Sequence, residues 1–96
     1  MKESVFKTKL ISELKNRFPG CEVILNDSGY IQAIPDLLIL FNDKWAMLEV
    51  KKSETSSKRP NQEYYVKHYG KMSYAAFICP ENKEIILDEL EQSFRP

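Results

Sequence analysis

Three charged residues flank the most hydrophobic part of the chain, the stretch "PDLLILFNDKWAMLEVKKS" at residues 35–53. Asp36 opens this stretch, and Glu49 and Lys51 stand near its far end. Burying an ionised side chain among apolar residues is unfavourable unless the charge is paired or bound to a metal. The three residues therefore need a common explanation, and their spacing offers one.

This spacing can place all three side chains on one face of a β-hairpin. If Asn42-Asp43 is a two-residue turn, Asp36 lies directly opposite Glu49, and Lys51 projects from the same face. A four-residue loop sets Asp36 opposite Lys51 and keeps the grouping. A three-residue loop separates Asp36 from the other two unless a bulge intervenes.

Two carboxylates that face each other across strands repel, and a divalent cation would resolve the repulsion. Oxygen ligands suit Mg²⁺ or Mn²⁺, which keep several waters, and the Val50 carbonyl could add one more oxygen. Lys51 could then orient or deprotonate a water, or neutralise the transition state of phosphodiester hydrolysis. The plainer alternative is that Asp36 caps a strand end and that Glu49 and Lys51 form a surface pair.

The remaining sequence predicts the elements that would position this hairpin. Phe6, Leu10, Leu14 and Phe18 recur every four residues and indicate a helix over 3–18. The other expected elements are strands at 21–25, 36–41 and 45–51, a weaker strand at 30–34 that leads to Pro35, a helix from Pro60 to Gly70, a strand at 73–79 and a final helix after Asn82. Pro35 has no N–H, so the hairpin ladder must begin after it or be interrupted there.

This order predicts an α/β fold, with a small mixed sheet flanked by helices, in a single domain over residues 1–96. The segment "DLLILF" is apolar on both faces, which indicates a central strand. A domain of 96 residues buries a modest share of its surface. A homodimer is therefore an open possibility.

Composition narrows the classes of function. The 14 basic and 14 acidic residues balance, which counts mildly against non-specific coating of nucleic acid. Bases nevertheless outnumber acids over residues 44–71, and acids outnumber bases over 81–95. Cys21 and Cys79 lie in apolar stretches and are expected to be buried thiols. No segment suits a signal peptide or a membrane span, so a cytoplasmic protein with no membrane partner is expected.

The pairs "PD" at residues 35–36 and "EVK" at 49–51, together with the element order, resemble the PD-(D/E)XK nuclease superfamily. The resemblance runs from the first helix to "YAAFIC". The chain is similar to the small VRR-NUC and Holliday-junction-resolvase-like members often found in phages, although it lacks the Val-Arg-Arg signature. The resemblance implies a restriction-endonuclease-like core of a helix, three strands, a helix and a strand, followed here by an extra C-terminal helix. It also implies a Mg²⁺-dependent DNA endonuclease, frequently dimeric, which a phage would deploy in the host cytoplasm.

The resemblance assigns two further residues to the active site. Glu13 would join the site from the first helix as a metal ligand or water-holding group, and Gln62 would join it from the helix after the Glu-x-Lys strand. From the residues alone, a solvent-facing Glu13 paired with a nearby lysine is favoured. The helical placement of Gln62 agrees with its assignment, because it shares a face with Tyr65 and Tyr69.

Basic residues follow the expected catalytic strand, where a bound DNA backbone would run. Lys52, Lys58 and Arg59 come directly after it, and Lys67 and Lys71 lie on the next helix. Contacts of this kind position DNA without reading its sequence and weaken as salt rises.

The aromatic residues and the single histidine of the second helix allow two interpretations. Tyr64, Tyr65 and Tyr69 could stack on bases, but their spacing suits burial better for at least two of them. His68 could touch a phosphate, although a surface or half-buried position is favoured.

The sequence thus favours a metal-dependent endonuclease that hydrolyses DNA phosphodiester bonds, with branched DNA as one candidate substrate. The alternative is a catalytically inactive module of the same fold that binds DNA or a protein partner. A third reading is an interaction protein that carries the pattern by chance. Metal-dependent cleavage separates the first from the second, and Mn²⁺ binding tests the third.

Overall fold

The computed structural model describes residues 1–96, and its helices and strands follow one another in the predicted order. They are α1 (Glu3–Arg17), β1 (Glu22–Leu25), β2 (Leu37–Phe41), β3 (Lys44–Val50), α2 (Pro60–Met72), β4 (Tyr74–Ile78) and α3 (Lys83–Ser93). The strands form one sheet in the order β1-β2-β3-β4, in which β4 is parallel to β3 and the other neighbours are antiparallel. The predicted α/β fold with a small mixed sheet is confirmed, including the central position of β2.

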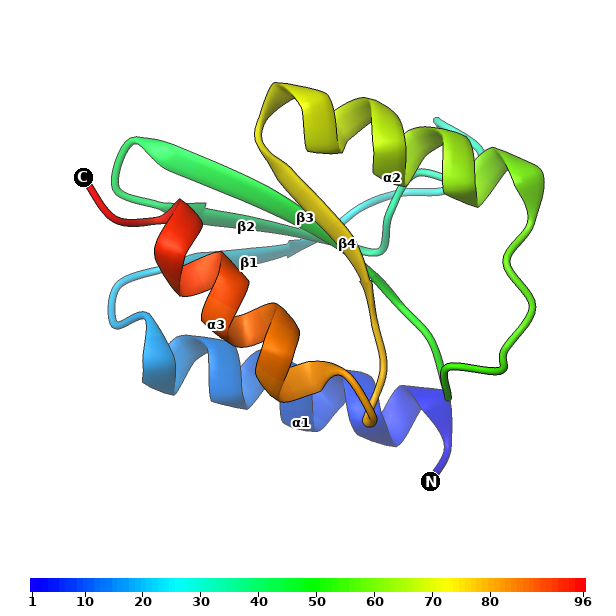
Figure 1. The fold of residues 1–96 in the computed structure, drawn as a ribbon, viewed down its shortest axis with the longest axis horizontal. Helices are drawn as coiled ribbons and strands as arrows, with labels where there is room; N and C mark the ends of the chain where they lie inside the picture. Colours follow the sequence, from blue (N-terminus) through cyan, green and yellow to red (C-terminus); the bar gives the residue numbers. More distant parts are fainter.

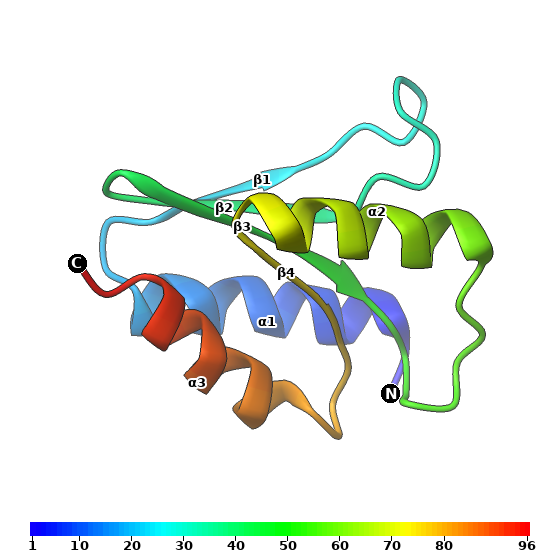
Figure 2. The ribbon, with the colours of Figure 1, turned by 45° about the horizontal axis from the view of Figure 1, so that its top comes forward.

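The helices cover the two faces of this sheet unequally. α1 and α3 lie on one face and α2 lies on the other, as the two ribbon views show (Figure 1, Figure 2). The main hydrophobic cluster has 14 buried residues, which come from α1, α3, the sheet and the segments directly after these two helices, and none from α2. The core therefore fills the space between the sheet and one helical layer.

The predicted hydrophobic stripes account for both helices of that layer. Phe6, Leu10 and Leu14 of α1 are buried, with Phe18 just beyond its end. In α3 the buried residues are Ile86, Leu87 and Leu90, followed by Phe94. The four-residue spacing places each set on one side of its helix, where it removes apolar surface from water.

The β2–β3 hairpin has a two-residue turn, one of the three loop lengths that its sequence allows. Its register pairs Leu37 with Leu48 at one end and Phe41 with Lys44 at the other, which leaves Asn42 and Asp43 in the turn. Asn42 has a φ of 56°, a left-handed conformation that asparagine tolerates better than most residues. The register therefore groups the side chains as the two-residue loop requires.

The expected weak strand at 30–34 is wrong, because this segment forms a chain of turns. The Asp27 carbonyl accepts hydrogen bonds from the N–H groups of Tyr30 and Ile31, over 3.2 and 3.4 Å. The Asp27 side chain accepts a third from Gly29, and Ala33 has a φ of 69°. The turn chemistry of Asp27 and Gly29 thus extends further along the chain than expected, and it satisfies backbone groups locally rather than in a ladder.

Two expectations about the chain's environment can also be compared with the structure. Cys21 and Cys79 are both free thiols; Cys79 is buried as expected, whereas Cys21 is only half-buried. None of the three helices combines the length and the apolar character needed to cross a membrane.

Candidate active site

The two predicted carboxylates meet at the open end of the β2–β3 hairpin. Asp36 immediately precedes β2, and Glu49 is the next-to-last residue of β3. The Asp36 N–H donates a hydrogen bond to Glu49 Oε1 over 3.2 Å. The Asp36 carboxylate in turn accepts one from the Val50 N–H over 2.9 Å. The structure therefore brings Asp36, Glu49 and Val50 together, as the hairpin register predicts.

Pro35 explains why the ladder ends at this point. The Lys51 N–H bonds to a carbonyl of β4, so the backbone groups of Val50, one residue earlier, face β2. Continuing the hairpin register sets Val50 opposite Pro35. Proline has no N–H to donate, so the Val50 carbonyl lacks the ladder donor that any other residue would bring. The Val50 N–H is satisfied by Asp36 instead.

The Gln62 side chain connects the carboxylate to the lysine. Its amide group donates a hydrogen bond to Glu49 Oε2 over 3.0 Å, and its carbonyl oxygen accepts one from Lys51 Nζ over 2.8 Å. The same oxygen accepts the Arg59 N–H over 3.2 Å, which is the bond that the third residue of a helix makes to its N-cap. The start of α2 therefore fixes the amide that links Glu49 and Lys51.

Lys51 is fixed by two oxygens that are not carboxylates. Its amine donates to Gln62 Oε1 and to the Ser57 carbonyl, the latter over 3.0 Å. It forms no ion pair with Asp36 or Glu49. The predicted trio is thus adjacent, but Gln62 stands between Lys51 and the nearest carboxylate.

Glu49 is the one charged residue in the protein that is classed as buried, with 6% of its surface exposed. Burial, and after it the neighbouring Asp36 charge, raise the pKa of its carboxyl group to about 7. The Lys51 charge and the Asp36 N–H oppose this rise only in part. Burial and the Asp36 charge both disfavour the ionised form of Glu49. The site therefore favours a proton or a cation beside Glu49.

A cleft of about 600 Å³ opens beside the two carboxylates. One wall is the first turn of α2, and the other is the β1–β2 loop, which projects beside that end of α2 (Figure 2). Ten residues line it: Ser28, Gln32, Ala33, Ile34, Asp36, Glu49, Arg59, Pro60, Asn61 and Gln62. Lys51 is not among them, but its charge lowers the pKa of Glu49, which is.

α1 reaches this site with a different residue from the expected one. Lys7 Nζ lies 3.8 Å from Asp36 Oδ1, whereas Glu13 accepts a hydrogen bond from Lys83 over 2.9 Å. The expectation that Glu13 completes the site is therefore not met. Glu13 lies six residues beyond Lys7, about 9 Å along the helix axis and turned roughly 120° away from it. It faces the start of α3 instead, where it pairs with a lysine as the alternative expected, although it is half-buried rather than solvent-facing.

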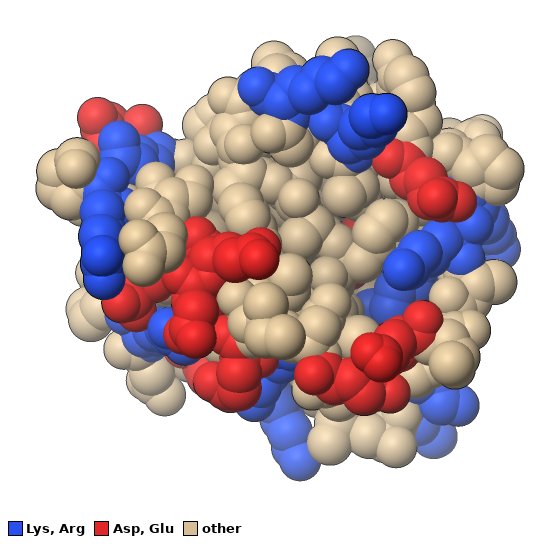
Figure 3. All heavy atoms as spheres, in the orientation of Figure 1, with Lys and Arg blue, Asp and Glu red and all other residues tan.

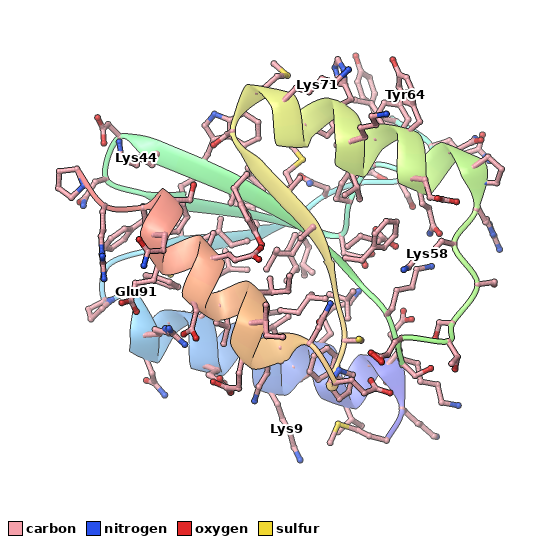
Figure 4. The ribbon with its side chains drawn as sticks, in the orientation of Figure 1. Lys9, Lys44, Lys58, Tyr64, Lys71 and Glu91 are labelled. Atoms are coloured by element: carbon pink, nitrogen blue, oxygen red, sulfur yellow. The ribbon has the colours of Figure 1, made fainter.

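The predicted DNA-contacting residues are spread over three places. Arg59 lines the cleft, and Lys52 is exposed in the loop after β3. The Lys58 amine lies 5.0 Å from the ring centre of Phe77 and points inward from its loop (Figure 4). Lys67 lies on the side of α2 that faces solvent. Only Arg59 is therefore placed directly beside the carboxylates.

The donor set suits a hard divalent cation bound by few protein ligands. Asp36 and Glu49 offer carboxylate oxygens, and the Val50 carbonyl lies at the same strand end. No group of three or more Asp, Glu, His or Cys side chains is arranged to hold a metal, so waters would have to fill the other positions. Mg²⁺ commonly binds in this way, through one or two carboxylates and several waters.

Comparison with known proteins supports the fold. No family model matches the sequence, and no curated protein matches it either. Among solved structures, the fold is similar to that of a protein described as "VRR_NUC domain protein", with a TM-score of 0.70 and 15% identity. The match covers 98% of this chain and 88% of that one. At this identity the likeness shows a shared fold and nothing finer.

Two contributors to the site were absent from the sequence prediction. Lys7 approaches Asp36 from α1, and the β1–β2 loop supplies a wall of the cleft. Lys7 stands one helical turn after Glu3, whose charge also reaches Glu49. No periodicity or motif marks which end of α1 lies over the hairpin, because that depends on how the helix crosses the sheet.

Proposed function

We propose that the chain is a metal-dependent endonuclease that hydrolyses phosphodiester bonds in DNA. The observation that carries this proposal is the meeting of Asp36 and Glu49 on a cleft, with the Lys51 amine linked to Glu49 through Gln62. The nuclease-like fold is consistent with it. The substrate class and the metal dependence are parts of the proposal.

Each residue has a role that its contacts support. Asp36, Glu49 and the Val50 carbonyl would hold Mg²⁺ or Mn²⁺. When bound, such an ion polarises a phosphoryl group and makes a water more acidic. Gln62 keeps the Glu49 carboxylate oriented toward the cleft and holds Lys51 nearby, from where the Lys51 charge would stabilise negative charge on the phosphate.

The alternative is a catalytically inactive module that binds DNA or a protein partner. The observation that favours it is the position of the Lys51 amine, which donates to Gln62 and the Ser57 carbonyl and does not line the cleft. Such a module would bind its partner equally well in EDTA and would turn over no nucleic acid.

Cleavage of a panel of linear, nicked and branched DNAs in Mg²⁺ or Mn²⁺ tests the proposal. We expect cleavage that EDTA abolishes and that Asp36→Asn reduces by at least a hundredfold. Asp43→Asn is the matched control, because Asp43 is the exposed aspartate in the turn of the same hairpin and its loss changes the net charge equally. If Lys51→Ala cleaved every DNA as fast as the wild type, the role given to Lys51 would be wrong.

Binding of Mn²⁺ alone, measured by calorimetry, separates the metal site from the chemistry. We expect the wild type and Asp43→Asn to bind Mn²⁺, and Asp36→Asn to bind it much more weakly. Equal binding by all three proteins would place the metal elsewhere and remove the basis of the proposal.

A further inference from the structure

The solvent-facing side of α2 carries a second set of residues that the proposed active site does not use. Tyr64, Lys67, His68 and Lys71 line a shallow pocket of about 270 Å³, which we call the outer α2 pocket. At about 100° per residue, these positions lie on the side of the helix opposite Gln62. Tyr64 and Lys71 both point away from the body of the protein (Figure 4).

The aromatic rings of this pocket are exposed and held in a fixed arrangement. Tyr64 is 60% exposed, and its ring is almost parallel to that of His68, with an angle of 7° and 5.7 Å between centres. Tyr64 also meets the edge of Tyr65, which stacks on Tyr69, and Tyr69 contacts Trp45 in the sheet. The half-buried Tyr65 and Tyr69 therefore anchor this cluster of rings to the sheet, and Tyr64 keeps more than half of its surface exposed to water.

The charge of the pocket is positive and uncompensated. Neither Lys67 nor Lys71 forms an ion pair, although Glu63 lies one turn before Lys67. Figure 3 shows basic side chains over the later part of α2, whereas acidic side chains gather over α3 on the same view. An anionic partner would thus be attracted to α2 and repelled from α3.

We propose that the outer α2 pocket binds single-stranded nucleic acid, with an unpaired base stacked on Tyr64 or His68 and backbone phosphates beside Lys67 and Lys71. Exposed aromatic faces combined with basic side chains are the means by which proteins hold single strands. A duplex hides its base faces and could use only the two lysines. The open Tyr64 ring therefore selects for an unpaired strand.

The position of the pocket deepens the proposed function, on which this last step rests. Arg59 and Gln62, in the first turn of α2, line the cleft beside the carboxylates, and the outer α2 pocket begins at Tyr64 in the next turn. A strand that leaves the cleft would cross the first turn of α2 to reach the pocket on the other side of the helix. The preferred substrate would then have a single-stranded segment next to the site of cleavage.

Fluorescence anisotropy in EDTA tests the binding without any cleavage. The probes are a labelled single-stranded DNA, an RNA of the same sequence, and the corresponding DNA duplex. We expect tighter binding of the single strands than of the duplex, and a loss of about 5- to 100-fold in single-strand affinity for Tyr64→Ala. Tyr64→Phe keeps the ring and should stay within about twofold of the wild type. The DNA and RNA arms show which sugar is preferred.

Matched charge variants test the role of the two lysines. The salt dependence of single-strand affinity, as the slope of log K against log salt, should become shallower by about 1.4 in K67Q/K71Q, for two lost phosphate contacts. K9Q/K15Q is the control, because it removes two exposed, unpaired lysines from α1 (Lys9 is labelled in Figure 4) and should keep the wild-type slope.

Three results would each overturn the inference: no single-strand binding by the wild type, equal affinity for the duplex, or unchanged binding by Tyr64→Ala. Because Tyr64 is exposed, its replacement should leave the fold intact, which circular dichroism checks. The absence of cleavage in Mn²⁺ would contradict the proposed function only, since these affinities are measured without metal.

Discussion

α2 and α3 have similar lengths, 13 and 11 residues, and lie on opposite faces of one sheet, yet they are attached to it by different means. α3 buries Ile86, Leu87 and Leu90 in the core, whereas no residue of α2 is buried. α2 is held by the hydrogen bonds of Gln62 and by half-buried aromatic rings. The comparison indicates that α3 completes the core, while α2 displays side chains toward the cleft and the solvent.

The charges on the two helices differ in the same way. The acidic groups of α3 are largely engaged: Arg17 pairs with Asp88 and Glu91, and the Tyr74 hydroxyl donates to Glu89. The lysines of α2 have no such partners, and the two helices carry opposite signs (Figure 3). A helix with internally satisfied charges suits a structural role, and one with free charges suits a binding role.

The largest effect that this comparison predicts is on stability. Leu90→Ala removes a fully buried side chain of α3 and should lower the free energy of unfolding by about 2–5 kcal/mol. Val66→Ala, on half-buried α2, should lower it by less than about 1.5 kcal/mol. Urea denaturation of both variants measures the difference. Equal losses would show that α2 contributes to the core as much as α3 does.

The next effect is on the proposed catalysis, and it can be tested because each of the two helices has a glutamine that can be replaced by alanine. Gln62→Ala should slow DNA cleavage by about 10- to 100-fold, because Glu49 and Lys51 lose the group that orients them. Gln92→Ala makes the identical change at an exposed position of α3 and should leave the rate unchanged. The measurement is the rate of cleavage in Mn²⁺ by equal amounts of folded protein. A similar rate for both variants would contradict the orienting role.

A smaller effect concerns the charge beneath α2. The pKa of Glu49 is raised to about 7 by burial and by Asp36, so the folded state keeps this proton while the unfolded state loses it between about pH 4.5 and 7. The stability of the wild type should therefore fall as pH rises through this range and level off above it. Glu49→Gln should escape the fall and be more stable by about 1–3 kcal/mol at pH 8 without metal.

Urea denaturation in EDTA at pH 4 and pH 8 measures this difference. Glu22→Gln is the control, because it removes an exposed carboxylate of β1 and should follow the wild-type curve. Added Mn²⁺ should stabilise the wild type and not Glu49→Gln. Parallel pH curves for wild type and Glu49→Gln would show that burial does not strain this carboxylate.

The smallest predicted effect is that of the ion pairs of α3. Arg17→Gln should lower the free energy of unfolding by less than about 1 kcal/mol, because its partners Asp88 and Glu91 are largely exposed. High salt should shrink the difference further. A loss above 2 kcal/mol in denaturation would mean that charge, rather than the apolar stripe, attaches α3.

The sequence was most informative where local rules decide the geometry. The two-residue turn and the alternation along the strands are enough to bring Asp36 and Glu49 together, since neither depends on distant residues. Gln62 is placed by the angular step of one helix, starting at Pro60. These local constraints also made the α/β element order predictable.

The sequence-based prediction failed where the packing angle between two elements decides which side chains meet. Glu13 and Lys7 are both polar residues near the apolar stripe of α1, and only the crossing of α1 over the sheet brings Lys7 to Asp36 and Glu13 to Lys83. The prediction of a strand at 30–34 failed for another reason, because the turns that begin at Asp27 continue to Ala33. The exposure of Tyr64 could not be predicted either, because it depends on Tyr65 and Tyr69 making the contacts toward the sheet.

Pro35 offers a way to weaken the proposed metal site without changing a charged residue. An alanine at that position would bring an amide hydrogen to the Val50 carbonyl, and the β2–β3 ladder could extend by one more hydrogen-bonded pair. The Val50 carbonyl oxygen would then accept a hydrogen bond within the sheet, and Asp36 would be drawn into the sheet. The missing N–H of Pro35 therefore ends the pairing of β2 and β3 before it reaches Val50.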